Sequence, residues 1–447
     1  MYDFAYKKEL AKALNIDDIS LFEPVVGEEE FITLIKLFGE SAYAPGNRLD
    51  FNKVDSFDFN NIKNHCFRAN LHVHTNASDG LADVNQILDS AVKIADENFT
   101  NSGFGFMLAI TDHDTVENAV NAVKIITSDK EKYKNLKLVL GCELSTVATN
   151  FSNQKKTLDI HTLLYCINPF EQKLCSFLQE KIEKKYSLAN KTLEELNTSL
   201  ADLLSQLNIK LSLEEAAKIH PMITKGQDEV SHPLKKYIFA KTLYSYYVDN
   251  NYKIKDILQN SNVSENMLSY EKPVYMYKSM FNNDRYFYIY REALEKYLNF
   301  ITDNKFSIKL ENIPKNIENA LLLAKQICEK SHPSANRSID AFSVFEDTLE
   351  FINTLDYGLI SIAHPARINY KYVDSQFDEF FDEFWQVFKQ HGKSRALAYE
   401  KYYQAYTGEK RIAVLPIIEK SASRYNLLPT GGIDSHAYCV YSRSPIA

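Results

Sequence analysis

Residues 71–80 read Leu-His-Val-His-Thr-Asn-Ala-Ser-Asp-Gly, and they carry the first of several polar motifs that follow apolar stretches of this chain. From 68 to 74 polar and apolar residues alternate, which predicts a short strand with His72 and His74 on the same face. The Asn, Ser, Asp and Gly that follow predict a turn, so Asp79 lies on the loop just past the strand. Two imidazoles and a carboxylate in this arrangement suit Zn, Mn or Fe. The alternative is an exposed strand with two incidental histidines.

The composition of the 447-residue chain bounds its class. This length suits two or three domains, or one large domain with an insertion. No apolar run reaches the length of about 18 residues that a membrane span needs, and the first eight residues lack the pattern of a secretory signal. The six cysteines are scattered without CxxC spacing, which predicts reduced core cysteines in a cytoplasmic protein.

The formal net charge of −8 argues against a protein that binds duplex DNA or RNA, because such proteins carry a basic face. It leaves room for a pocket that takes a short phosphorylated substrate, since bound divalent cations reverse the local field.

Strands and helices alternate along two parts of the chain. The predicted strands cover 68–74, 104–110, 137–140, 158–167, 357–363 and 395–402. The predicted helices cover 83–97, 116–128, 376–390 and 412–425. This order predicts an α/β fold with a parallel sheet, and polar residues at the carboxyl ends of such strands are typical of barrel enzymes.

Two regions lie outside this alternation. Residues 1–65 predict a helical extension, with an amphipathic helix at 28–38. Residues 169–352 predict a mostly helical, charged insertion, which we expect to cover the mouth of the barrel and the active site. A plain additional helical domain is the alternative. The barrel itself would be formed by 66–168 and 353–447.

A His, Asp or Glu follows one predicted strand after another. These residues are His72, His74, Asp79, His113, Glu143, His161, His364, Asp434 and His436. In a closed parallel barrel the strand ends meet at one mouth, so these side chains are expected to converge. Six imidazoles and three carboxylates are too many for one ion, and they suit two or three divalent cations bridged by a carboxylate and a hydroxide.

These motifs together resemble those of the PHP (polymerase and histidinol phosphatase) family. The motifs are His-x-His followed by Ser-Asp-Gly, Thr-Asp-His-Asp, Gly-x-Glu, a histidine within a strand, Ala-His-Pro-x-Arg and Gly-Gly-x-Asp-x-His. The resemblance covers about 68–168 and 353–447, roughly half of the chain. It implies a distorted (β/α)7 barrel with a trinuclear metal site and phosphoesterase activity.

The resemblance also distributes the nine residues among three ions. The first ion would be held by His72, His74, Glu143 and Asp434, the second by Glu143 as a bridge with His161 and His364, and the third by Asp79, His113 and His436. Asp79, His113, Glu143, Asp434 and Arg367 would be the catalytic residues. A hydroxide bridging two ions would attack phosphorus in line, while the third ion and Arg367 neutralise the phosphoryl oxygens.

Asp79 in Ser-Asp-Gly and Arg367 after Ala-His-Pro are similar to the subgroup that acts on nucleotides and short oligonucleotides. Members of that subgroup carry a Pro-His element in the insertion, and the nearest counterpart is Ser231-His232-Pro233, which makes His232 a candidate substrate contact together with Arg367. Two departures from the family pattern occur, Ile433 for the usual Ser and Leu397-Ala398-Tyr399-Glu400 for Gly-Ile-Glu.

The sequence therefore predicts a phosphoesterase that uses two or three Mn²⁺, Zn²⁺ or Fe²⁺ ions and hydrolyses nucleotides or short 5′-phosphorylated oligonucleotides. A phosphatase acting on histidinol phosphate or another small phosphomonoester is the alternative within the same class. A non-catalytic scaffold, in which metal braces the barrel and the insertion binds a partner, is the alternative from another class.

Overall fold

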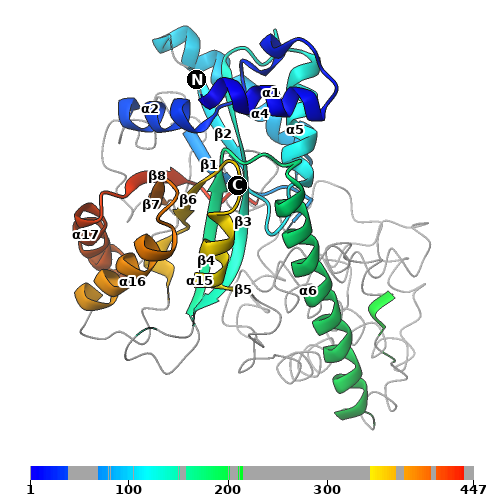
Figure 1. Cartoon of the computed structure of the whole chain (residues 1–447), viewed down its shortest axis with the longest axis vertical. Coiled ribbons are helices and arrows are strands. Elements are labelled where there is room, and N and C mark those ends of the chain that lie inside the picture. The colour runs from blue at the N-terminus through cyan, green and yellow to red at the C-terminus, as the bar shows by residue number, and fades with distance from the viewer. Residues whose placement is uncertain are drawn as a thin grey trace, which may run out of the picture. The chain divides into compact units, whose positions relative to one another are not determined.

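The computed structural model describes residues 2–38, 69–78, 80, 82–103, 105–148, 151, 158–199, 201, 210, 212–214, 343–368, 377–403 and 409–436. The chain divides into two compact units, one formed by Met1–Lys181 with Phe342–Ala447 and the other by Ile182–Ala341. The first unit contains the sheet and the helices that cover it (Figure 1).

One sheet with the strand order β1-β2-β3-β4-β6-β7-β8 forms the centre of the first unit (Figure 1). The strands are β1 Ala69–Val73, β2 Phe106–Ile110, β3 Leu136–Ala148, β4 Leu158–Tyr165, β6 Leu359–Ile362, β7 Leu397–Tyr403 and β8 Leu428–Gly432, and the short β5, Ser343–Val344, pairs with β3. The His74 N–H donates to the Ser435 carbonyl at 2.9 Å, and the Ser435 N–H donates to the His72 carbonyl at 3.1 Å. These bonds join β1 to the residues after β8, so the sheet is nearly closed into a barrel.

The sheet is mixed, and the expectation of a wholly parallel sheet is wrong at β4. Strands β1, β2 and β3 run parallel, as do β6, β7 and β8, but β4 is antiparallel to both β3 and β6. Only 149–157 connect β3 to β4, and this is shorter than the dozen or more residues that a crossover between parallel strands needs. As a result, Glu143 and His161 lie within a pair of strands and not beyond strand ends.

The interior of the barrel holds an apolar core that α2 (Glu28–Phe38) completes. Alternate strand residues such as Leu71, Met107 and Tyr165 share one cluster with Phe31 and Ile35 of α2. The ring of Phe31 lies 5.3 Å from that of Tyr165. The predicted helix at 28–38 is therefore confirmed, and it closes one end of the barrel with apolar side chains.

Helices cover the outside of the sheet through a second cluster of buried residues. They are α4 Val84–Ser102, α5 Glu117–Ser128, α15 Phe345–Ile352, α16 Phe377–His391 and α17 Glu409–Arg424. Four of them confirm the helices predicted at 83–97, 116–128, 376–390 and 412–425. Helix α4 begins at a capping box formed by Asp83 and Gln86, and it ends before Gly103, whose φ of 70° is the left-handed conformation that favours glycine.

Residues 2–38 of the predicted helical extension contain helices and pack on the barrel, and the rest of the predicted extension, 39–65, lies outside the described residues. Helices α1 (Tyr2–Ala13) and η1 (Ile19–Phe22) precede an extended stretch. Within this stretch, the Val26 N–H donates to the Leu138 carbonyl at 2.8 Å, and the Leu138 N–H donates to the Pro24 carbonyl at 2.8 Å. The segment is thus joined to β3 by main-chain bonds.

Much of the predicted insertion falls outside the described residues, and its position over the barrel mouth stays a prediction. Helix α6, Gln172–Ser199, leads from the first unit into the second. Of the helices in the described ranges, none combines the length and the apolar character that crossing a bilayer requires.

The packing of α2 makes the first testable prediction. Phe31→Ala should lower the free energy of unfolding of the first unit by about 3–5 kcal/mol, because the ring is fully buried inside the barrel. Urea unfolding can be followed by the fluorescence of Trp385, the single tryptophan of the chain, which is buried in the same unit. Phe4→Ala, at a ring that is 54% exposed, is the control and should change the value by less than about 0.5 kcal/mol. Equal effects of the two changes would show that α2 does not complete the core.

Candidate metal centre

Four ligand atoms from three parts of the barrel converge on one point. They are Nε2 of His72 and of His74 at the end of β1, Oε2 of Glu143 on β3, and Oδ1 of Asp434 just after β8. His72 Nε2 lies 3.1 Å from His74 Nε2, 2.9 Å from Glu143 Oε2 and 3.4 Å from Asp434 Oδ1. His74 Nε2 lies 3.1 Å from Glu143 Oε2 and 3.2 Å from Asp434 Oδ1.

These spacings fit a divalent ion. Ligand atoms bound at 2.0–2.1 Å around a tetrahedral zinc stand about 3.3–3.4 Å apart, close to the distances between these four atoms. All four side chains are buried, so an ion at this point would be shielded from bulk water. The nitrogen and carboxylate donors are also of the type that zinc, manganese and iron accept. The four residues could therefore hold one ion.

An irregular strand brings the two histidines to this point. The register of β1 against β2 shifts between Asn70 and Val73. Leu71 belongs to the interior cluster and Val73 to the outer one, while His72 and His74 both face the site. The side chain of Asn70 fixes this conformation, since its Oδ1 accepts from the His72 N–H at 3.2 Å and from the Ile433 N–H at 3.0 Å. Irregular pairing of this kind re-aims side chains next to functional sites.

The carboxylate of Glu143 faces two groups of histidines at once. Its Oε1 lies 2.8 Å from His161 Nδ1 and 3.7 Å from His364 Nε2. Its Oε2 is one of the four atoms described above, and it also lies 3.3 Å from His113 Nδ1. A carboxylate whose two oxygens are directed to different imidazole groups is suited to bridging two ions.

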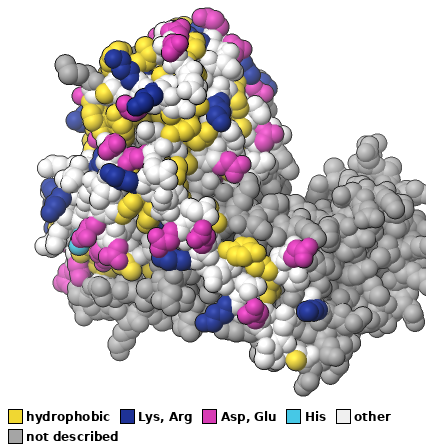
Figure 2. Space-filling model, turned by 45° about the vertical axis from the view of Figure 1, so that its right-hand side comes forward, with side chains coloured by type: hydrophobic (Ala, Val, Ile, Leu, Met, Phe, Trp, Pro, Cys, Tyr) yellow, Lys and Arg dark blue, Asp and Glu magenta, His cyan; other side chains and the backbone are white. Residues whose placement is uncertain are grey.

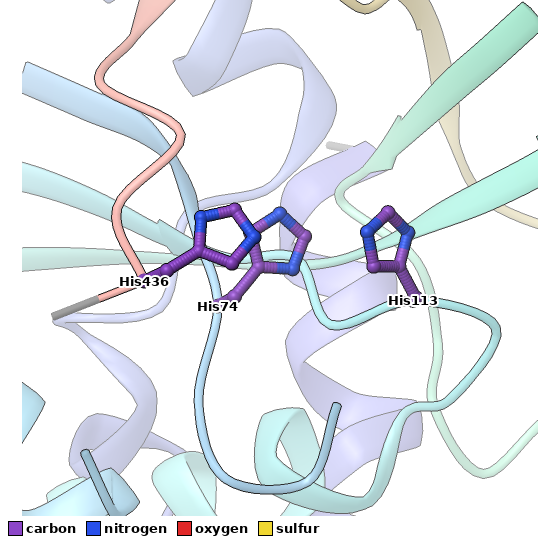
Figure 3. A group of neighbouring side chains, drawn as sticks. All are labelled: His74, His113 and His436. Atoms are coloured by element: carbon purple, nitrogen blue, oxygen red, sulfur yellow. The ribbon is translucent and has the colours of Figure 1, made fainter. Parts of the chain in front are cut away.

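A third group consists of His74, His113 and His436, which lie in a row with His74 in the middle (Figure 3). The ring of His74 is stacked on the rings of both neighbours, with centroids 4.5 Å from His113 and 4.4 Å from His436. Nδ1 of His436 donates to the carbonyl of Asp434 at 2.8 Å, so in the neutral ring Nε2 carries the lone pair. One ligand atom from each of the three residues lies within 4.8 Å of the others.

Two residues of the candidate metal centre have a strained backbone conformation. His364 has φ of 30° and Asp434 has φ of 56°, in the left-handed region that non-glycine residues rarely occupy. Such strain costs about 1–3 kcal/mol at each residue and tends to collect at functional sites.

Arg367 lies beside Asp434, on the short helix η7, Pro365–Arg367, that follows β6. Its Nη1 donates to the hydroxyl of Tyr403 at 3.0 Å and lies 3.5 Å from Asp434 Oδ2. Burial lowers the pKa of Arg367, but Tyr403 and Asp434 outweigh it and raise the pKa above its usual value. The guanidinium therefore stays charged, with about a third of the side chain exposed.

The structure thus brings eight of the nine predicted metal ligands together with Arg367. The eight are His72, His74, His113, Glu143, His161, His364, Asp434 and His436. Asp79 and His232 lie outside the described residues, so their predicted roles stay predictions.

The sequence did not single out Glu400 as part of the site. This fully buried carboxylate on β7 has Oε1 3.2 Å from His72 Nδ1, and its Oε2 accepts from the His364 N–H at 2.8 Å. A carboxylate on the second ring nitrogen of a histidine fixes the tautomer that leaves the first nitrogen for a metal. Gly432 makes room for this pair, because a Cβ there would collide with His72 and crowd Glu400. A glutamate inside a buried strand was the available signal.

Tyr403 and Asp112 form hydrogen bonds that fix a ligand and a loop of the candidate metal centre. The hydroxyl of Tyr403 donates to Asp434 Oδ2 at 2.7 Å, which orients that carboxylate. Asp112 accepts from the N–H of Thr75 at 2.7 Å, from its hydroxyl at 2.7 Å and from the hydroxyl of Ser78 at 2.6 Å. Asp112 therefore fixes the loop after β1.

Opposite charges shift the pKa values at the centre. Burial lowers the pKa of His72, but the carboxylates of Glu143, Glu400 and Asp434 outweigh it and raise the pKa to about 10. Burial raises the pKa of Glu143, but His72, His113 and His161 outweigh it and hold the pKa well below its usual value. Burial and the neighbouring Arg367 lower the pKa of His364 to about 3. Without a metal, His72 is therefore an imidazolium and Glu143 a carboxylate at pH 7.

The second prediction is that metal binding releases a proton from His72. Because the pKa of His72 is about 10, an ion that takes His72 Nε2 at pH 7 must displace a proton. Mn²⁺ binding should then release at least one proton, and its affinity should rise with pH by up to about tenfold per unit until the pH passes this pKa. Titration calorimetry in buffers of different ionisation enthalpy counts the protons. Affinity that is independent of pH, with no proton released, would contradict the role of His72.

The third prediction tests Glu400. Glu400→Gln should lower the affinity for Mn²⁺ by about 10–100-fold, because the amide holds the His72 ring less strongly than the carboxylate does. The matched control is Glu350→Gln, whose exposed carboxylate lies 2.9 Å from His391 Nδ1 outside the site, and this change should leave the affinity unchanged. Calorimetry measures both, and thermal unfolding confirms that both variants fold. An unchanged affinity in Glu400→Gln would mean that the carboxylate has no part in metal binding.

Comparisons with known proteins give weak likenesses only. No family model matches the chain, and no curated protein matches it. An amidohydrolase from Chromobacterium violaceum, solved with bound sulfate and no metal, is 14% identical over 83% of this chain and 88% of that chain, with a TM-score of 0.43. A protein from Bifidobacterium adolescentis proposed to be a metal-dependent phosphoesterase is 13% identical over the same shares, with a TM-score of 0.38. At these identities and TM-scores, neither likeness tells what this chain binds or catalyses.

Proposed function

We propose that this chain is a metal-dependent phosphoesterase of the PHP type, built on a distorted (β/α)7 barrel. The observation that carries the proposal is the bridging position of Glu143, with one oxygen directed to His72 and His74 and the other to His161 and His364. Adjacent groups of imidazoles that share one carboxylate suit two or three ions better than one.

The proposed chemistry divides between the ions and the chain. Bound divalent ions lower the pKa of water into the neutral range and offset charge on phosphoryl oxygens. Arg367 presents several N–H donors that match two phosphoryl oxygens at once. Tyr403 and Asp434 contact Nη1 and hold the guanidinium in place, so it would need little reorganisation when a phosphate binds.

The proposed substrates are nucleotides or short 5′-phosphorylated oligonucleotides. Arg367, in the position that the nucleotide-directed subgroup also fills, supports this choice over a neutral substrate. On the face that Figure 2 shows, basic and acidic side chains of the described residues are interspersed. The described residues of this face form no broad basic area of the kind that a duplex needs.

The fourth prediction tests the activity. The protein with Mn²⁺ is offered a 5′-phosphorylated pentanucleotide, a nucleoside 3′,5′-bisphosphate and histidinol phosphate, and the products are separated by chromatography and identified by mass. We expect mononucleotides or a 3′-dephosphorylated nucleotide. Glu143→Ala and Asp434→Ala should lower the rate at least about a hundredfold with the fold retained, because each removes a carboxylate from the centre. Asp382→Ala, at a half-buried carboxylate that pairs with Arg424 away from the candidate metal centre, is the control.

The outcomes separate the alternatives. Free histidinol as the main product would replace the nucleotide with a small phosphomonoester as substrate. No hydrolysis by a protein that still binds metal would favour the scaffold. Full activity in Glu143→Ala would overturn the proposed metal centre.

A further inference from the structure

Lys181 on α6 is a buried lysine at the edge of the candidate metal centre. Its side chain is 3% exposed, and Nζ donates to the Ser145 carbonyl at 2.7 Å and lies 3.0 Å from Asp114 Oδ1. The ring of Phe177, one turn earlier on α6, lies 5.7 Å from Nζ. A lysine is rarely buried to this degree, because its ammonium must then find partners inside the protein.

The groups that Lys181 contacts belong to the two elements that carry His113 and Glu143. Asp114 follows His113 directly, is fully buried and has φ of 49°, in the left-handed region. Its N–H donates to the Glu143 carbonyl at 2.8 Å, and its Oδ1 accepts from the Ser145 N–H at 3.3 Å. The Glu143 N–H donates to the Asp112 carbonyl at 3.1 Å. The loop that carries His113 is thus bonded to both main-chain groups of Glu143, its N–H and its carbonyl.

We propose that Lys181 is a positioning residue that fixes His113 against Glu143, an inference that rests on the proposed metal-dependent function. The ammonium links the Asp114 carboxylate, on the loop after β2, to the Ser145 carbonyl, on β3. This link holds His113 Nδ1 at its distance of 3.3 Å from Glu143 Oε2. Lys181 itself contacts neither phosphate nor metal in this role.

The proposal separates two parts of the centre. His113 depends on the link through Asp114, whereas His72, His74 and Asp434 are held by β1 and by the residues after β8. Loss of Lys181 should therefore weaken an ion that uses His113 and spare the ion of the four-atom group. A purely structural lysine would lower the stability without this difference between the ions.

The fifth prediction concerns the 447-residue chain and compares Lys181→Met with Lys184→Met, a change at an exposed lysine three residues further along α6. Hydrogen exchange of the metal-free protein follows the amides of Asp114 and Glu143. Calorimetry with Mn²⁺ alone follows the number and affinity of the ions.

In Lys181→Met, both amides should exchange at least about tenfold faster, and one class of Mn²⁺ sites should weaken at least about tenfold while another stays within about twofold. Lys184→Met should match the wild type, and Lys181→Arg, which keeps the charge, should recover part of the loss.

Wild-type exchange together with unchanged Mn²⁺ binding in Lys181→Met would overturn the proposal, as would a uniform loss of all ions. If Lys181→Met does not fold, the double variant Lys181→Met/Asp114→Asn, which removes both charges, replaces it. Selective weakening in the folded double variant would support the role, and wild-type binding would overturn it. None of these measurements requires hydrolysis. If the selective effect is seen but no phosphate ester is hydrolysed, the proposed function is contradicted and the role of Lys181 stands. If the wild type binds no Mn²⁺, both proposals are contradicted.

Discussion

The arrangement of the candidate metal centre depends on the buried carboxylate of Glu143, which lies between imidazoles from several strands. A carboxylate that is removed from water is costly unless opposite charges or hydrogen-bond donors surround it. Here the surrounding donors are imidazoles from β1, β4 and the loops after β2 and β6. Strands that lie far apart in the sequence must therefore meet at this point. The order of strands around the barrel achieves this.

The interior of the barrel is divided between two kinds of chemistry. At one end, Phe31 and Ile35 of α2 complete an apolar core. At the other end, polar groups are paired with one another, as the contacts of Glu400 with His72 and with the His364 N–H show. The apolar end stabilises the fold, and it allows the polar end to keep strained positions such as those of His364 and Asp434.

The sequence was informative where local patterns are strong. Alternation predicted that His72 and His74 share one face, and the spacing of apolar residues predicted the helix at 83–97 that became α4. The direction of β4 was mispredicted because strand pattern alone does not reveal direction, although the short connection between β3 and β4 excluded a parallel pair. Glu400 and Lys181 were missed for a different reason. Each is a charged residue within a regular element. For Glu400 the apolar neighbours in its strand were a weak signal, whereas only tertiary contacts distinguish Lys181 from a solvated residue.

The contact between β1 and the residues after β8 has a consequence for how the chain matures. Ligands on both sides of this seam, His72 with His74 on one and Asp434 with His436 on the other, are separated by more than three quarters of the chain. During synthesis the earlier pair emerges long before the later pair, so an ion at the four-atom group would find all four of its ligands only after Asp434 has emerged. Contacts of such high sequence separation form late in folding. An ion at the seam would therefore bind the barrel once the residues after β8 have joined β1, and not before.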